Sequence, residues 1–245
     1  MPVTPDVILL HGALGASSQL DALADELRPP FRIHQIDFEG HANAPSAGRP
    51  FRIEHFAENV IARMDTERIS SARFFGYSMG GYVALYLALH RPDLVECVAT
   101  LGTRFRWDRE TAEREAARLD PGAIRAKVPR FADALAARHE RAGGWEGVLA
   151  QTADLLRHLG QAPLLTDATL ARIRQPVRII VGDRDNTVSV DESTSVARAL
   201  SNGSVTVLPD TPHPIEQVEV LALTFVLRDF LALQVGQGVF TRRPR

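Results

Sequence analysis

The stretch Gly-Tyr-Ser-Met-Gly-Gly at residues 76–81 lies between the run Arg-Phe-Phe at residues 73–75 and a helical pattern at residues 82–89. This order predicts a buried strand that turns sharply into a helix, with Ser78 at the tip of the turn. Glycines two residues to either side of the serine leave room for the strained backbone of such a turn. The hydroxyl of Ser78 would stand clear of the sheet edge, which makes Ser78 the candidate nucleophile.

A Gly-x-Ser-x-Gly pattern alone also fits an ordinary glycine-rich connection, so other segments must decide between the two interpretations. Residues 7–12 form a continuous apolar run that ends in His-Gly, and a loop of small residues follows it. Residues 176–185 form a second buried-type strand that ends in carboxylates, and residues 205–214 form a third that is followed by His213. Serine, then aspartate, then histidine is the chain order of one known catalytic scaffold.

These motifs, together with Asp-Phe-Glu-Gly-His at residues 37–41, resemble the α/β-hydrolase superfamily, in its serine-nucleophile branch with a helical cap. The resemblance covers most of residues 6–233. It implies a catalytic triad of Ser78, Asp185 and His213, in which the histidine is the general base and the aspartate orients it. Asp183 is the competing acid, but the family's acid is at the last position of Gly-x-x-Asp, which favours Asp185.

The same resemblance implies two backbone donors for an oxyanion hole. They are the N–H of Ala13, which follows His-Gly, and the N–H of Met79, which follows the serine. Backbone donors depend little on side-chain identity, so these two positions follow from the motif itself.

Strand candidates alternate with helical segments, and this alternation predicts an α/β fold with a mostly parallel, about six-stranded sheet flanked by helices. The first strand begins six residues from Met1, so we expect the sheet to lack the two N-terminal strands that many relatives have. The first helix is expected to begin at Ser18, with its hydroxyl as the cap. The strand candidates are residues 6–10, 31–37, 72–77, 95–101, 176–181 and 204–208.

One span breaks the alternation, because residues 104–166 contain helical patterns and no credible strand. We expect a helical cap insertion there, within a single domain that spans residues 1–245. Aromatic side chains in such a cap either line a substrate pocket or anchor the cap to the core, and both interpretations stay open for each residue. The candidate pocket residues are Tyr82, Phe105, Trp107 and Trp145.

The composition fits one globular domain of 245 residues, with 45% hydrophobic and 24% charged residues and a net charge of −2. This charge gives no reason to expect nucleic acid or an anionic membrane as a partner. The sequence shows neither a secretory signal nor a membrane span, so a cytoplasmic location is expected. Residues 235–245 are expected to be a flexible tail. The oligomeric state is not indicated.

The expected function is hydrolysis of a small carboxylic ester through an acyl-enzyme. No metal and no cofactor are expected, because ligand clusters and nucleotide-binding fingerprints are missing from the sequence. A carbon–carbon bond hydrolase or a related lyase on the same scaffold is the alternative. That lyase carries an arginine where this chain has Tyr82, which counts against it. A non-enzymatic ligand receptor is a further alternative.

Overall fold

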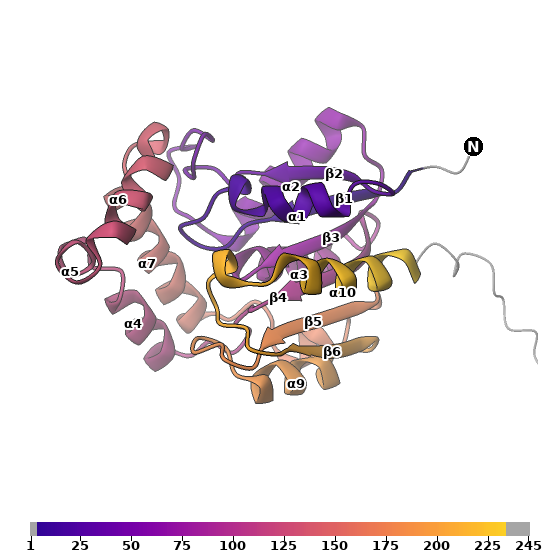
Figure 1. The fold of residues 1–245 in the computed structure, drawn as a ribbon. Coiled ribbons are helices and arrows are strands. Elements are labelled where there is room, and N and C mark those ends of the chain that lie inside the picture. The colour runs from indigo at the N-terminus through magenta and orange to yellow at the C-terminus, as the bar shows by residue number, and fades with distance from the viewer. Residues whose placement is uncertain (1–3, 234–245) are drawn as a thin grey trace, which may run out of the picture.

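The computed structural model describes residues 4–233, and its centre is one sheet of six parallel strands in the order β2-β1-β3-β4-β5-β6. Figure 1 shows the sheet between two layers of helices. The predicted six-stranded parallel sheet is therefore confirmed, and so is its flanking by helices. The strands are β1 (Asp6–Leu10), β2 (Arg32–Ile36), β3 (Ala72–Tyr77), β4 (Val95–Leu101), β5 (Val177–Gly182) and β6 (Gly203–Leu208).

Successive residues of the central strands point into two different cores, because side chains alternate between the faces of a sheet. In β1, Ile8 packs with the helices of one face, whereas Val7 and Leu9 pack with those of the other. Both faces are buried, which is why these strands read as continuous apolar runs rather than as alternating patterns. Burial on both faces also fixes the position of each strand end, and so the place where each loop leaves the sheet.

The helices account for most of the remaining described residues. The first one differs from the prediction, because a 3₁₀ turn (Ser17–Leu20) precedes it and the α-helix begins at Asp21. The capping side chain is Gln19, whose Oε1 accepts the Ala16 N–H at 2.9 Å, and not Ser18. The helices are α1 (Asp21–Leu27), α2 (Ile53–Glu67), α3 (Met79–His90), α4 (Arg109–Ala117), α5 (Pro121–Lys127), α6 (Pro129–Arg138), α7 (Trp145–Gln161), α8 (Asp167–Leu170), α9 (Val190–Ala199) and α10 (Val220–Leu233).

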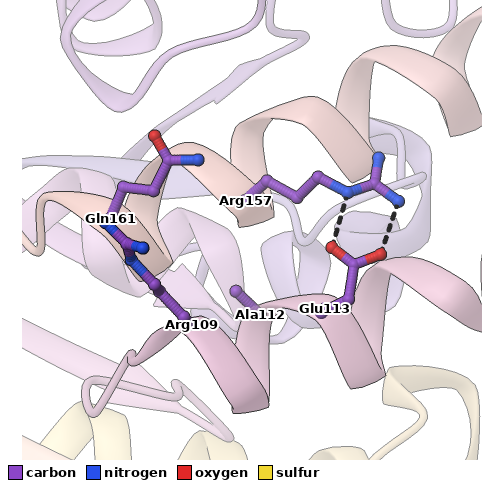
Figure 2. A pocket seen from close by; sticks show the side chains of 5 residues that line it. All are labelled: Arg109, Ala112, Glu113, Arg157 and Gln161. Carbon is purple, nitrogen blue, oxygen red and sulfur yellow. Dashed lines mark hydrogen bonds and ion pairs between the residues drawn. The ribbon is translucent and has the colours of Figure 1, made fainter.

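Helices α4 to α7 follow β4 and precede β5, and Figure 1 shows them gathered beyond one end of the sheet. We call them the α4–α7 segment. Helices α4 and α7 approach each other closely at Gly160, where an added Cβ would lie 2.4 Å from the Cβ of Ala112. Figure 2 shows the hollow beside this crossing, where Arg157 of α7 donates to Glu113 of α4 at 2.8 and 3.0 Å. The predicted tail at residues 235–245 lies outside the described residues.

Within the part of the chain that the structure describes, no helix combines the length and the apolar character needed to cross a bilayer.

Two glycines of α7 give a matched test of this helix crossing. We expect Gly160→Ala to lower the free energy of unfolding by about 1–3 kcal/mol, because the new methyl group overlaps Ala112. Gly147 lies in the same helix with open space around it, so Gly147→Ala should raise stability by up to about 1 kcal/mol through helix propensity. Urea unfolding of both variants checks this. Equal effects of the two substitutions would contradict the close crossing.

Candidate active site

Ser78 lies at the junction of β3 and α3 with φ 51° and ψ −115°, a positive φ that is strained for any residue other than glycine. The backbone around it is packed too closely for side chains. A Cβ on Gly76 would lie 2.3 Å from the nitrogen of Gly81, and a Cβ on Gly80 would lie 2.3 Å from the oxygen of Leu10. The strand-turn-helix predicted from the motif is therefore present, and it requires glycine at these positions.

The other end of the site is formed by the loops that follow β5 and β6. Nδ1 of His213 donates a hydrogen bond to Oδ2 of Asp185 at 2.8 Å, and the carboxylate side chain is 2% exposed. Its Oδ1 accepts the N–H groups of Thr187 and Val188 at 2.7 and 2.8 Å. Burial acts to raise the pKa of Asp185, but the hydrogen bond and charge of His213 and the two N–H groups outweigh it. The pKa of Asp185 therefore lies below its usual value.

Asp183, the competing acid, is exposed. Its Oδ1 accepts the N–H of Thr211 at 3.2 Å, and so it supports the loop that carries His213. The hydroxyl of Tyr77 donates to the backbone oxygen of His213 at 3.1 Å and holds the same loop from the side of β3. Gly102 leaves room for the imidazole of His213, since a Cβ on residue 102 would lie 3.2 Å from Nδ1.

Ser78 and His213 line one cavity of about 480 Å³, together with Ala13 and Met79. The structure thus brings the candidate nucleophile, base and oxyanion donors to one place. Met79 is the first residue of α3, and an N–H in the first turn of a helix has no partner inside the helix. Other residues of the lining belong to no motif and were not predicted from the sequence. They are Ile53 of α2, Thr152 of α7 and the charged residues Arg104, Glu115 and Arg118.

The four aromatic candidates for the pocket wall divide into two pairs. Tyr82 and Trp107 line the cavity. Phe105 and Trp145 are not among its lining residues, which favours the interpretation that these two side chains anchor the segment to the core. Phe105 lies behind Tyr82, with stacked rings whose centroids are 6.3 Å apart. Trp145 is buried and anchors α7, and the guanidinium carbon of Arg125 lies over its ring, 5.1 Å from the ring centroid.

The loop that contains Ala13 is held by a histidine from the α4–α7 segment. Leu14 and Ala42 both have positive φ, 59° and 49°, although neither is glycine. Nε2 of His139 donates to the oxygen of Leu14 at 3.0 Å, and Nδ1 accepts the N–H of Ala42 at 3.1 Å. Arg138 also donates to the oxygen of Leu14, at 2.9 Å. These bonds fix two strained loops, at a strain cost of about 1–3 kcal/mol each.

His139 belongs to a buried cluster with His11 and His41. The ring centroid of His41 lies 5.2 Å from that of His11 and 5.7 Å from that of His139. Each of the hydrogen-bonding nitrogens of His139 has one fixed role, so the ring is neutral. Burial lowers the pKa of His139, and it lowers the pKa of His11 to about 4. His41 is also held well below its usual pKa by burial. Burial therefore favours the neutral form of all three imidazoles.

No three His, Cys, Asp or Glu side chains among residues 4–233 are grouped so that they could hold a metal ion. The expected absence of a metal and of a cofactor stays a prediction. The hollow between α4 and α7 has a volume of about 440 Å³, and its lining contains neither a nucleophile nor a histidine. The cavity beside Ser78 is therefore the better candidate for a reaction site.

The neutral histidine cluster predicts how stability depends on pH. Because the pKa of His11 falls from about 6.5 in the unfolded chain to about 4, the folded state binds fewer protons between these values. Stability should therefore fall as the pH drops from about 6.5 towards 4, by up to about 1.4 kcal/mol per pH unit for each such histidine.

Urea unfolding at several pH values measures this slope. His139→Gln removes one buried histidine, so the free energy of unfolding should depend less steeply on pH between about 6.5 and 5. His90→Gln removes an exposed histidine outside the cluster and is the control for the loss of a histidine as such. A slope in His139→Gln equal to that of the unmodified chain would mean that His139 takes up its proton in the folded state.

A family model described as "alpha/beta hydrolase fold" matches residues 5–144. A pimeloyl-[acyl-carrier protein] methyl ester esterase of Neisseria meningitidis serogroup A is 37% identical over 113 residues, which are 45% of this chain and 35% of that relative. The match therefore spans about a third of that relative's length.

A relative from Pseudomonas savastanoi pv. phaseolicola that bears the name of a carbamate hydrolase, RutD, is 28% identical over 246 residues, 93% of this chain and 94% of the relative. Among solved structures, the enol-lactonase from Burkholderia xenovorans LB400 superposes with a TM-score of 0.74 at 24% identity, over 94% of this chain and 92% of that one. This similarity concerns the fold. Since the family model matches more than half of the sequence, the chain belongs to the alpha/beta hydrolase fold family.

Proposed function

We propose that this chain is a serine hydrolase that cleaves a small carboxylic ester through an acyl-enzyme. The observation that carries the proposal is the His213–Asp185 hydrogen bond of 2.8 Å at a cavity whose lining also contains Ser78 on its strained turn. The names of the relatives, an ester hydrolase and a carbamate hydrolase, add support, because both describe cleavage at a carbonyl group.

In the proposed reaction Asp185 accepts a hydrogen bond from the Nδ1–H of His213, which keeps the proton on Nδ1 and leaves Nε2 as the basic nitrogen. Nε2 takes the proton of the Ser78 hydroxyl as the serine oxygen attacks the ester carbonyl. The imidazolium that forms is stabilised by the carboxylate, and its proton then passes to the departing alcohol. Water deacylates the enzyme by the same steps in reverse, with His213 as the base.

The tetrahedral intermediate carries a negative charge on the former carbonyl oxygen, and this charge needs donors that are already in position. The N–H groups of Ala13 and Met79 fill this role in our proposal. The hydrogen bonds of His139 and Arg138 to the oxygen of Leu14 support it, because they hold the loop next to Ala13. A loop that needs no reorganisation during the reaction stabilises the developing charge more strongly.

The α4–α7 segment acts as a cap in this proposal, within a single domain of the hydrolase fold. Residues of α7 form the apolar wall opposite Ser78, and they include Leu155, Leu156 and Leu159. Such a wall excludes water from the cavity and so strengthens the electrostatic interactions with the intermediate. It also offers an apolar surface to the substrate.

The lyase alternative loses support at Tyr82. The hydroxyl of Tyr82 accepts the N–H groups of Leu164 and Leu165 at 3.2 and 3.0 Å, so it ties the end of the cap to α3. A side chain in that role replaces the substrate-binding arginine that the lyase resemblance would require. Cleavage of a carbon–carbon bond remains the alternative, and it uses the same three residues.

Turnover of p-nitrophenyl butyrate by three variants tests the proposal. Asp185→Asn should lower kcat by up to about 10⁴, because the imidazole loses the partner that fixes its tautomer. Asp183→Asn is the matched control, since the side chain has the same size and lies in the same loop. It should stay within about threefold of the unmodified chain. Ser78→Ala should lower kcat by at least about 10³.

A larger loss of kcat in Asp183→Asn than in Asp185→Asn would mean that Asp183, and not Asp185, is the acid of the triad. No turnover by the folded, unmodified chain, together with ligand binding that Ser78→Ala leaves unaffected, would favour the receptor alternative.

A further inference from the structure

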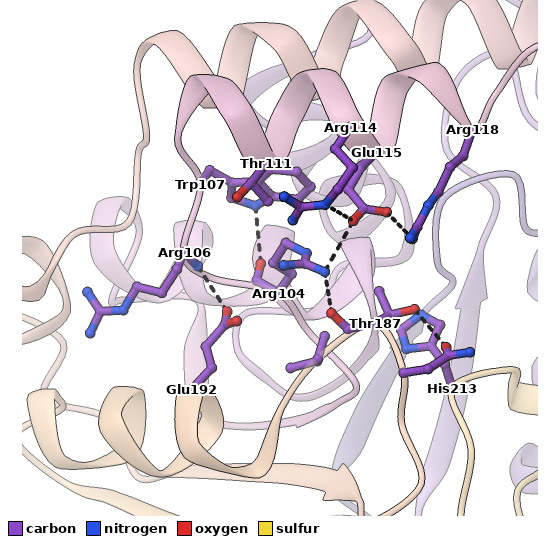
Figure 3. Close-up of polar contacts among 12 residues, drawn as sticks. Arg104, Arg106, Trp107, Thr111, Arg114, Glu115, Arg118, Thr187, Glu192 and His213 are labelled. Carbon is purple, nitrogen blue, oxygen red and sulfur yellow. Dashed lines mark hydrogen bonds and ion pairs between the residues drawn. The ribbon is translucent and has the colours of Figure 1, made fainter.

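One side of the Ser78 cavity carries three guanidinium groups around a single carboxylate. The carboxylate is Glu115 of α4, and Figure 3 shows the arginines around it. Arg118 donates to it at 2.9 Å, whereas Arg104 and Arg114 lie 3.5 and 3.6 Å from its other oxygen. One negative charge therefore faces three positive charges, and the cluster as a whole is positive.

Two of these guanidiniums belong to the cavity itself, because Arg104 and Arg118 line it together with Ser78 and His213. Arg104 also lies next to the loop of the proposed catalytic acid, since its Nη2 donates to the backbone oxygen of Thr187. Glu115 is the one carboxylate among the described residues that line this cavity. The positive charge is thus presented to whatever molecule occupies the cavity.

Arg104 is held in a fixed orientation. Its guanidinium lies over the ring of Trp107, 5.6 Å from the centroid, and Nε1 of Trp107 donates to the backbone oxygen of Arg104 at 3.2 Å. The side chain is 15% exposed. Nη2 of Arg104 donates to Thr187 and also lies 3.5 Å from Glu115. Its Nε and Nη1 have no hydrogen-bond partner among residues 4–233, so an anion that reached them would meet a guanidinium that is already ordered.

A structural role alone does not explain this arrangement. A single arginine neutralises Glu115 and joins α4 to the loop after β5, and Arg104 by its position does both. Arg118 adds a second positive charge at the cavity, on a side chain that is 61% exposed. An anion that reached both guanidiniums would form charge-assisted hydrogen bonds, which are about twice as strong as hydrogen bonds between neutral groups.

We propose that Arg104 and Arg118 form an anion subsite, and that the preferred substrates are esters that also carry a free carboxylate, such as half-esters of dicarboxylic acids. This inference rests on the proposed ester hydrolysis. The ester carbonyl lies at Ser78, the chain of the acid lies along the apolar wall of α7, and the free carboxylate reaches the two arginines. Phosphate is the other anion with this hydrogen-bonding chemistry, and competition distinguishes it from a carboxylate.

The test compares pairs of methyl esters that differ in charge and hardly in shape. One member is the monomethyl ester of succinate, glutarate, adipate or pimelate, and the other has a primary amide in place of the free carboxylate. We expect kcat/KM of the unmodified chain to favour the half-ester at its best chain length by about tenfold or more. Added salt should reduce this ratio.

Arg118→Gln and Arg104→Gln should each bring the ratio towards one, and Arg118→Glu should reverse it. Arg118 is exposed, so its variants test the subsite even where Arg104→Gln fails to fold. Arg157→Gln is the matched control, because it removes one arginine from the separate hollow of Figure 2. It should keep the ratio of the unmodified chain. The free dicarboxylate should inhibit more strongly than inorganic phosphate.

A ratio of one or less in the unmodified chain would overturn the subsite, and so would a ratio that survives both Arg118→Gln and Arg104→Gln. Stronger inhibition by phosphate would overturn its assignment to carboxylates. Hydrolysis of the amide-bearing ester without any charge preference would leave the proposed ester hydrolysis standing. No hydrolysis of any ester would overturn both the proposed ester hydrolysis and the anion subsite.

Discussion

The close contact of backbone with backbone at the end of β3 is the constraint on which the site depends. Gly76 and Gly80 let the strand, the first turn of α3 and the end of β1 approach within distances that no Cβ allows. This packing holds Ser78 at a positive φ that the residue would not adopt in an open loop. The strain is balanced by the two buried cores of the sheet, which keep β1, β3 and α3 in place.

Parallel strands end at one edge, so the loops after β1, β3, β5 and β6 meet there although they lie far apart in the sequence. The site is built from these loops on one side and from the α4–α7 segment on the other. His139 connects the two sides, because it comes from the end of α6 and bonds Leu14 and Ala42. The α4–α7 segment and the loop that contains Leu14 are therefore joined by hydrogen bonds, and burial lowers the pKa of the His139 imidazole.

The sequence predicted the sheet well, since the observed strands lie within one or two residues of the expected ranges. Buried parallel strands are continuous apolar runs, and their ends are marked by glycine and by polar loop residues. Asp185 and His213 were proposed as partners because both follow such strands in motifs with fixed spacing, and their side chains do form a hydrogen bond. The role of His139 was not predictable, because its partner Leu14 is 125 residues away and no motif links them. Phe105 lies in the connection between β4 and α4, and Trp145 begins an amphipathic helix. Neither context reveals which side chains face a cavity and which pack behind it.

The central claim is that His213 and Asp185 activate Ser78 in the folded chain. Intact mass after exposure to a fluorophosphonate tests it most directly, because this reagent labels an activated serine without need of the natural substrate. We expect one adduct on the unmodified chain, mapped to the peptide that contains Ser78, and none on Ser78→Ala. The absence of an adduct on folded, unmodified chain, or an adduct that persists in Ser78→Ala, would contradict it.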